Sequence, residues 1–317
     1  MAVTDAITTG ALRERRVVVP LRVPVAGLAA VTAILVQGPS GWGERTTPPP
    51  GYPVDAGAAR RAAEEASSGA WPVACRDRVA VNALVPALPP DEAAALAAAA
   101  ARAGFGCVKV KVGATDDTRH DVDRVAAVRD AVGPGVPLRV DANGAWDVDT
   151  AVAVLAELAA YDLELAEQPV ASIDDLAEVR RRVAMPLAAD ECIRSIVDAL
   201  RLARTGAADA VVVKVQPLGG VAAAIDVVEA AGVPAIVSSL YETSVGVAAG
   251  LALAAALPEL PWACGLGTVA LLAGDVVRDS LVPVGGELAV GGAAHNPILV
   301  GHREVWWWAR KENNTFV

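Results

Sequence analysis

Two lysines and three acidic residues recur at regular intervals through the middle of the chain. They are Lys111, Asp141, Glu167, Asp190 and Lys214, with spacings of 30, 26, 23 and 24 residues, and each lies at the end of a short apolar run. Three carboxylates that meet at one place repel one another unless a cation neutralises them. Ligands that are all oxygen favour a hard ion, Mg²⁺ first and Mn²⁺ second. The pattern predicts a divalent metal held by Asp141, Glu167 and Asp190.

The lysines then predict removal of a proton from a carbon next to a substrate carboxylate. Such a proton is very weakly acidic, and its loss creates an enediolate whose two negative charges a divalent cation stabilises. A neutral lysine can be the base if neighbouring cations lower its pKa, and Lys109 lies on the same strand face as Lys111. Lys214 would face the substrate from the opposite side. For any one of these residues alone, a structural salt bridge is the alternative interpretation.

Further residues at or beside predicted strand ends are candidates for contacts with the substrate or around the metal. They are Lys109, Asn143, Glu191, Ser238, Ser239 and Gly265. Glu191 is expected to pair with a lysine, and the two serines either contact the substrate carboxylate or cap a helix. Trp146 is expected either to line the pocket or to pack between loop and helix. The three histidines lie outside every predicted strand end, which argues against a histidine base: His120, His295 and His302.

The elements that must position these residues alternate between β-branched runs and alanine-rich helical segments. The runs predict eight strands, at 79–85, 107–112, 138–141, 163–167, 187–190, 210–215, 235–239 and 263–268. Helices are predicted between them, including 91–102, 117–132, 147–160, 173–183 and 221–231. Eight such units suit a (β/α)8 barrel, whose catalytic groups lie at the carboxyl ends of its strands. A doubly wound open sheet is the alternative, but no GxGxxG or Walker sequence follows an early run.

Both ends of the chain differ from this alternation. Strands are predicted at 16–22 and 30–37 and a helix near 56–66, whereas GPSGWGE and TTPPPGYP are predicted as turns or loops. Near the other end, LVPVGGELAVGG predicts a hairpin. We therefore expect an α+β capping domain formed by residues 1–75 and 276–317, packed on a barrel of residues 76–275. The tail that contains Trp306–Trp308 is not expected to be ordered throughout.

Composition excludes several classes of protein. A net charge of −10 and a pI near 4.9 argue against nucleic acid or an anionic membrane as a partner. The longest apolar run, 245–257, is shorter than the about 20 residues that span a bilayer, so it predicts a buried helix. The cysteines lack metal-binding spacing and are expected to be reduced, mostly buried thiols of a cytoplasmic protein: Cys75, Cys107, Cys192 and Cys264.

Several motifs in register resemble the muconate-lactonizing branch of the enolase superfamily. They are KVKVG, DANGAW, EQP, ADE and VKVQPLGG, and GWGE, SSLYETSVG and GLGT extend the match over almost the whole chain. Within this branch the sequence most resembles the actinobacterial o-succinylbenzoate synthases. That narrower resemblance rests on the short chain, the PLRVP segment, and GLGTVALLAGDVV followed by LVPVGGEL.

The resemblance implies a modified barrel under a capping domain, Mg²⁺, and a step of menaquinone synthesis. That step is loss of water from 2-succinyl-6-hydroxy-2,4-cyclohexadiene-1-carboxylate. It also implies that Lys111 is the base and the acid that helps hydroxide leave, and that Lys214 steadies the enediolate. Two capping segments depart from the relatives: Ala26-Gly27 replaces an Arg-Gly pair, and ERTTPPPGYP replaces an aromatic-rich stretch. Both bear on which substrate is taken.

Other functions remain open at this level. An N-acylamino acid racemase, a dipeptide epimerase or a cycloisomerase of the same superfamily would use the same two lysines. A Schiff-base aldolase would use Lys214 or Lys111 as a nucleophile and need no metal. A barrel that only binds would tolerate loss of Lys111. The expected partner is a small carboxylate substrate, and no sequence feature predicts the oligomeric state.

Overall fold

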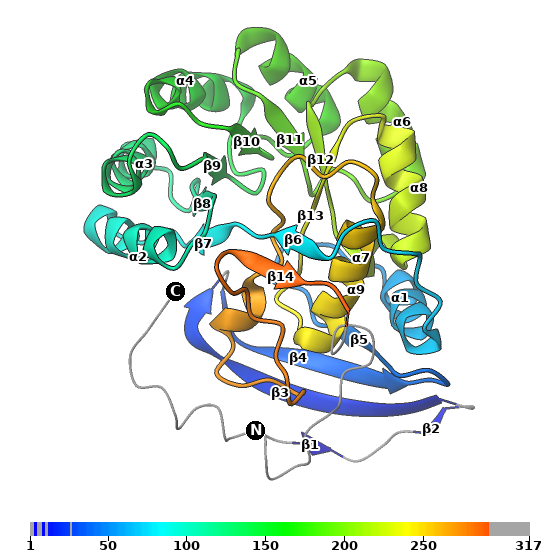
Figure 1. Cartoon of the computed structure of the whole chain (residues 1–317). Helices are drawn as coiled ribbons and strands as arrows, with labels where there is room; N and C mark the ends of the chain where they lie inside the picture. Colours follow the sequence, from blue (N-terminus) through cyan, green and yellow to red (C-terminus); the bar gives the residue numbers. More distant parts are fainter. Residues whose placement is uncertain (1–2, 5–7, 10–11, 26, 292–317) are drawn as a thin grey trace.

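A computed structural model describes residues 3–4, 8–9, 12–25 and 27–291 of the 317-residue chain (Figure 1). Its centre is a curled sheet of seven parallel strands in the order β13-β12-β11-β10-β9-β8-β7. The strands are β7 (Ala83–Val85), β8 (Val108–Lys111), β9 (Leu138–Asp141), β10 (Leu165–Glu167), β11 (Leu187–Ala189), β12 (Ala210–Val213) and β13 (Ala235–Val237). The predicted modified barrel is confirmed.

A short bridge rather than an eighth regular strand closes the barrel. Cys264 forms a parallel bridge with Val81, and Gly265 forms one with Ser238. A Cβ atom on Gly265 would lie 2.5 Å from Ser238 Oγ, so glycine permits this close approach. The predicted last strand is therefore wrong in length, because the chain turns into the 3-10 helix η2 (Thr268–Leu271).

Helices connect the strands and cover the outside of the sheet (Figure 1). Their bounds are α2 (Pro90–Arg102), α3 (Thr118–Val132), α4 (Val148–Leu158), η1 (Ala159–Tyr161), α5 (Ile173–Arg182), α6 (Ile196–Thr205), α7 (Val215–Leu218), α8 (Val221–Ala231) and α9 (Ser244–Ala256). Side-chain caps begin several of them, as when Ser172 accepts the Asp175 N–H at 3.1 Å. Helix α9 is apolar and almost wholly buried, as predicted. Among the described residues no helix is long and apolar enough to cross a membrane, and the expected cytoplasmic location stays a prediction.

An antiparallel sheet and one helix form the capping domain below the barrel in Figure 1. They are β1 (Val3–Thr4), β2 (Thr8–Thr9), β3 (Leu12–Val25), β4 (Leu28–Gln37), β5 (Trp42–Thr46) and α1 (Ala56–Ser68), with the sheet order β1-β3-β4-β5 and β2 paired to β3. The prediction of a turn at GPSGWGE is confirmed for residues 38–41 but wrong for Trp42, Gly43 and Glu44, which lie in β5. A Cβ atom on Gly43 would lie 1.8 Å from the Ala63 carbonyl oxygen, so glycine here allows α1 to pack against the strand.

The predicted C-terminal hairpin is right for its turn, where Val284 and Glu287 exchange backbone hydrogen bonds at 2.9 and 3.2 Å, but wrong for its strand pairing. Strand β14 (Glu287–Ala289) pairs antiparallel with β6 (Arg78–Ala80), and only a single bridge joins Val284 to Glu287 across the turn. Local alternation identified the strand but not a partner some 200 residues earlier in the chain. The pairing crosses the boundaries drawn at residues 75 and 276, and this domain division stays a prediction. The tail with Trp306–Trp308 lies outside the described residues.

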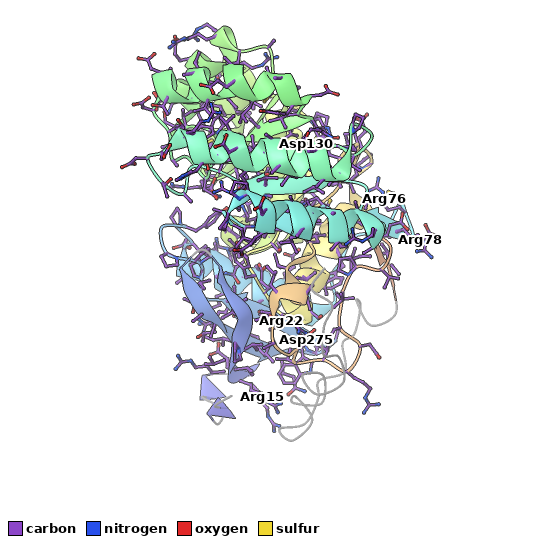
Figure 2. All side chains as sticks on the ribbon, turned by 90° about the vertical axis from the view of Figure 1, so that its left-hand side faces the viewer. Arg15, Arg22, Arg76, Arg78, Asp130 and Asp275 are labelled. Carbon is purple, nitrogen blue, oxygen red and sulfur yellow. The ribbon has the colours of Figure 1, made fainter. Side chains whose placement is uncertain are left out.

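Two buried carboxylates join the capping sheet and the C-terminal segment to the N-terminus of α9. Glu44 of β5 accepts the N–H groups of Thr243 at 3.0 Å and Gly246 at 2.9 Å, and Asp275 accepts that of Ser244 at 3.2 Å. The first N–H groups of a helix have no partner within it and carry partial positive charge, so carboxylates suit them. Figure 2 labels both Asp275 and Arg22; the Nε of Arg22, on β3, donates to the carbonyl of Leu272, in the segment that leads to Asp275, at 3.0 Å.

Candidate active site

All eleven site residues predicted from the sequence line one cavity of about 350 Å³. They are Lys109, Lys111, Asp141, Asn143, Glu167, Asp190, Glu191, Lys214, Ser238, Ser239 and Gly265. Leu84, Leu96, Phe105 and Leu271 are among the apolar side chains that complete its wall. The chain has four lysines, and three of them lie here. The cavity is large enough for a small-molecule substrate and mixes an apolar wall with converging charges.

Strand register brings three of these residues into one row. Lys111 on β8 is the register partner of Asp141 on β9, and Asp141 is the partner of Glu167 on β10. Alternate residues of a strand point to opposite faces, so Lys109 and Lys111 both face the cavity while Val108 and Val110 pack in the core. The prediction that both lysines share one face is confirmed.

Ion pairs link the lysines to the carboxylates. Lys109 Nζ lies 2.9 Å from an oxygen of both Asp141 and Glu167. Lys111 Nζ donates to Asp141 Oδ2 at 2.6 Å and to Asn143 Oδ1 at 2.7 Å. At the opposite side of the mouth, Lys214 donates to the carboxylate of Asp190. Positive and negative groups therefore alternate across the cavity.

The carboxylates differ in how their surroundings change their pKa values. Burial, with a smaller contribution from Asp141, raises the pKa of Glu167 to about 7. Burial and the neighbouring Glu191 also raise the pKa of Asp190. Burial alone would raise the pKa of Asp141 as well, but Lys109 and Lys111 lower it well below its usual range. Repulsion among buried carboxylates is thus only partly offset by the lysines.

Two of the lysines are held in the charged form. Burial alone would lower the pKa values of Lys109 and Lys214, yet the carboxylates raise both: Asp141 and Glu167 act on Lys109, and chiefly Asp190 on Lys214. A lysine that stays an ammonium group can stabilise developing negative charge but cannot accept a proton. This arrangement suits Lys214 to an electrostatic role.

The donor set fits a hard divalent cation in chemistry, although not as an assembled cluster. No three histidine, cysteine, aspartate or glutamate side chains in the described part of the chain lie close enough together to hold an ion, and Lys109 lies between Asp141 and Glu167. The donors are nevertheless all oxygen, buried, and close enough to raise one another's pKa. The buried Oε2 of Glu191 has no hydrogen-bond partner among the described residues. Asp141, Glu167 and Asp190 are the residues that would hold the ion.

Tyr52 is a site residue that the sequence analysis missed. Its hydroxyl donates to Asp190 Oδ1 at 3.2 Å, and Lys214 Nζ lies 4.6 Å from the centroid of its ring. Tyr52 belongs to the proline-rich segment between β5 and α1, which is a loop as predicted. The available signal was a single aromatic residue in that segment, but nothing local indicates that the loop reaches the barrel mouth.

Gln168 was also missed. Its Oε1 accepts the N–H groups of Asp190 at 2.6 Å and Cys192 at 3.4 Å, while its Nε2 donates to the Val170 carbonyl at 2.6 Å. Gln168 and Asn143, each next to or near a carboxylate strand end, both have positive φ, at 38° and 48°. Non-glycine residues adopt this conformation rarely, and such strain concentrates at functional sites. The signal in the sequence was a glutamine straight after Glu167, within the EQP motif.

The contacts of the serine pair and of Glu191 differ from some of those predicted. The serine pair does not cap α9, because its N-cap is Thr243; Ser239 Oγ instead donates to the Gly265 carbonyl at 2.8 Å. Glu191 accepts from Asn143 Nδ2 at 2.8 Å, and no ion pair joins it to a lysine within the described ranges, so the predicted lysine partner is wrong.

The tryptophan, histidine and cysteine residues to which the sequence analysis gave no catalytic role do not line the cavity where the structure describes them. Trp146 is buried but does not line it, and His120 is exposed beside Asp117. Burial raises the pKa of Cys192 to about 12 and of Cys264 to about 11, so neither is an activated thiolate. His295 and His302 lie outside the described residues.

The comparison with known proteins agrees with this arrangement. The family model described as "Enolase C-terminal domain-like" matches residues 92–294. The o-succinylbenzoate synthase of Thermobifida fusca (strain YX) is 51% identical over 277 residues, which cover 87% of this chain and 86% of that protein.

Solved structures show the same fold. The muconate lactonizing enzyme of Pseudomonas fluorescens, complexed with muconolactone, has a TM-score of 0.84 at 21% identity and covers 96% of this chain and 99% of its own. The dipeptide epimerase of Enterococcus faecalis V583, complexed with Mg and the dipeptide L-Leu-L-Tyr, has a TM-score of 0.78 at 24% identity, with 90% and 98% covered. The chain belongs to the enolase superfamily and, within it, to the family of the actinobacterial o-succinylbenzoate synthases.

Proposed function

We propose that this chain is an o-succinylbenzoate synthase. It dehydrates 2-succinyl-6-hydroxy-2,4-cyclohexadiene-1-carboxylate to 2-succinylbenzoate, a step of menaquinone synthesis. The observation that carries the proposal is 51% identity to a relative of that name over most of both chains. A cavity in which all the candidate lysines and carboxylates meet supports it.

Lys111 is the proposed base. As a neutral amine, its nitrogen takes the proton from C1, the ring carbon that carries the carboxylate, and the ammonium group so formed then gives that proton to the hydroxyl that leaves C6. The C1–H and C6–O bonds break, one water leaves, and the ring gains its third double bond. Lys111 is suited to this exchange because its side chain is 20% exposed to the cavity, whereas that of Lys109 is only 9% exposed.

Lys214 stabilises the negative charge that builds up on the substrate carboxylate while the proton is away from C1. Its burial strengthens this effect, because a fixed charge acts over short range in a low-dielectric site. Asp141, Glu167 and Asp190 hold Mg²⁺, or Mn²⁺ in its place, which when bound supplies a further positive charge for the substrate carboxylate. Asn143 and Glu191 orient these groups, and Ser238, Ser239 and Gly265 lie where the substrate carboxylate or side chain would pass.

The direct test is an assay of the purified protein with Mg²⁺ and the cyclohexadiene substrate, following formation of the aromatic product. We expect turnover with kcat in the ordinary range of about 1–1,000 s⁻¹. Candidate N-acylamino acids and dipeptides are incubated in D₂O in parallel, because a racemase or epimerase exchanges the α-proton. No aromatic product together with α-proton exchange would replace the synthase proposal by one of these.

A further inference from the structure

The capping domain and the barrel meet through a reciprocal hydrogen-bond pair close to Lys214. Thr46, the last residue of β5, donates its N–H to Gln216 Oε1 at 2.6 Å, and Gln216 Nε2 donates to the Thr46 carbonyl at 2.9 Å. Both residues are buried. Strand β5 is the edge of the capping sheet, so the glutamine amide pairs with that edge as a neighbouring strand would.

Gln216 and Thr46 lie close in sequence to Lys214 and Tyr52, which contact each other. Gln216 follows Lys214 by two residues, and Thr46 precedes the loop that carries Tyr52. The Tyr52 ring lies over the Lys214 ammonium at 4.6 Å, a distance at which the ring face attracts a cation. The hydrogen-bonded residues Gln216 and Thr46 therefore anchor the chain close to Lys214 and to the Tyr52 loop, respectively.

The loop between β5 and α1 is restricted enough for the position of β5 to determine the position of Tyr52. Four of the nine residues at 47–55 are proline, which locks φ at each of these positions. The loop starts firmly, because Thr47 N–H donates to the Thr32 carbonyl at 2.9 Å, and it ends at Asp55, which caps α1 by accepting the Ala58 N–H at 2.8 Å. With both ends held, the place of Tyr52 depends on where β5 sits against the barrel.

We propose that Gln216 is a positioning residue: through its amide pair with Thr46 it sets the Tyr52 ring over Lys214 and so holds the Lys214 ammonium in place. The effect of this contact on catalysis rests on the proposed function of Lys214. The position of the Tyr52 ring over Lys214 does not rest on it, and lysine labelling can test that position without any turnover.

The chain offers a matched control for general docking of the capping domain. Glu65 of α1 accepts the N–H groups of Val221 at 2.7 Å and Ala222 at 3.1 Å, at the N-terminus of α8. Like the Gln216 pair, this contact joins one side chain to the backbone of the other domain. It does not adjoin Lys214 or the Tyr52 loop, so Glu65→Ala weakens docking without the proposed coupling.

The experiment is reductive methylation of the folded protein, with each lysine quantified by peptide mass spectrometry. Lys214 is 7% exposed and Lys111 is 20% exposed, and Lys111 serves as the internal reference. We expect Gln216→Ala to raise Lys214 labelling relative to Lys111 by about fivefold or more, as local opening does, while Glu65→Ala changes it by less than about twofold. Gln216→Glu keeps the side-chain volume but loses the donor to Thr46, and it gives the same comparison if Gln216→Ala does not fold.

A double-mutant cycle tests whether Gln216 acts through Tyr52. Tyr52→Leu alone should raise Lys214 labelling, and adding Gln216→Ala should raise it little further, because the two changes remove one coupled contact.

In the dehydration assay Gln216→Ala should lower kcat about tenfold with a smaller change in KM, whereas Glu65→Ala should leave kcat unchanged. Equal labelling in Gln216→Ala and Glu65→Ala, or additive effects in the cycle, would overturn the inference. If labelling behaves as expected but no variant or wild type makes the aromatic product, only the proposed function fails.

Discussion

Lys111 Nζ lies 2.6 Å from Asp141 Oδ2, and the two residues are register partners on neighbouring parallel strands. Strand pairing therefore sets this contact, although 30 residues of chain separate the partners. A slip of one residue between β8 and β9 would turn one of the two side chains out of the barrel. Backbone hydrogen bonds between strands thus place both the proposed base and its carboxylate neighbour, and residues on strands are held more precisely than residues on loops.

The two lysines should respond differently to arginine. Arginine keeps the positive charge but cannot give up its proton, so Lys111→Arg and Lys111→Ala should both lower kcat/KM about 10²–10⁴-fold. Lys214→Arg should retain more activity than Lys214→Ala, because charge is what that position supplies. Steady-state kinetics on the four variants decide the matter. Activity of Lys111→Arg within tenfold of wild type would contradict the assignment of Lys111 as the base.

Removal of divalent metal should stop turnover without unfolding the protein. Dialysis against EDTA should abolish formation of the aromatic product, and added Mg²⁺ should restore it while the circular dichroism spectrum stays unchanged. Asp190→Asn should weaken Mg²⁺ binding, measured by calorimetry, by about tenfold or more, because the amide carries no charge for a hard cation. The exposed Asp149→Asn is the control. Full activity in EDTA would instead favour a Schiff-base mechanism, which borohydride trapping would reveal.

Glu44 should make folding stability depend on pH. Burial, opposed by the Thr243 hydrogen bond and aided by Glu242, raises its pKa from 4.5 to about 7. Between these values the folded chain keeps a proton that the unfolded chain has released, so the free energy of unfolding falls as pH rises. The contribution of Glu44 is fully present below about pH 4.5 and is lost as pH rises through about 7, amounting to at most roughly 3 kcal/mol.

Glu44→Gln removes this titration. Urea unfolding at several pH values should therefore show a flatter dependence between pH 4.5 and 7 in Glu44→Gln than in wild type. Glu64→Gln, on the exposed side of α1 where it pairs with Arg60, should keep the wild-type slope. A Glu44→Gln curve parallel to that of wild type would show that Glu44 does not titrate in this range.

Gly265 should tolerate no side chain. The Cβ atom of Gly265→Ala would lie 2.5 Å from Ser238 Oγ, where the barrel closes, so we expect a loss of about 1–3 kcal/mol in stability together with lower activity. Gly135→Ala is the matched control, because a Cβ atom there meets nothing within 4 Å. The control should change stability by no more than about 1 kcal/mol, and in the stabilising direction. Equal stability of both variants would contradict the role given to the close approach at Gly265.

Much of the barrel and its site could be predicted from the sequence, because both depend on local patterns. Strand β9 and helix α8 begin and end where their apolar periodicity does, and the polar residue after each apolar run marks a strand end. Once parallel strands are assumed, Lys111, Asp141 and Glu167 must meet at one edge. The outcome required no knowledge of distant contacts.

What could not be predicted depends on contacts distant in sequence. Strand β14 has its partner in β6, and Gly43 lies in a strand because α1 packs against it. The same holds for Tyr52, whose loop was recognised but not its destination. A glycine or proline indicates an unusual backbone locally, while the reason for it lies in another part of the chain.

The two partners of the Glu44 contact are made at very different times during protein synthesis. Thr243, whose N–H this carboxylate accepts, follows 199 residues later. At about 5–20 residues per second, a ribosome needs roughly 10–40 s to make that stretch, and until then the Glu44 carboxylate lacks the N–H groups at the start of α9 that it accepts in the folded chain. The capping sheet is thus made first, but its contact with α9 forms only after most of the barrel has been made.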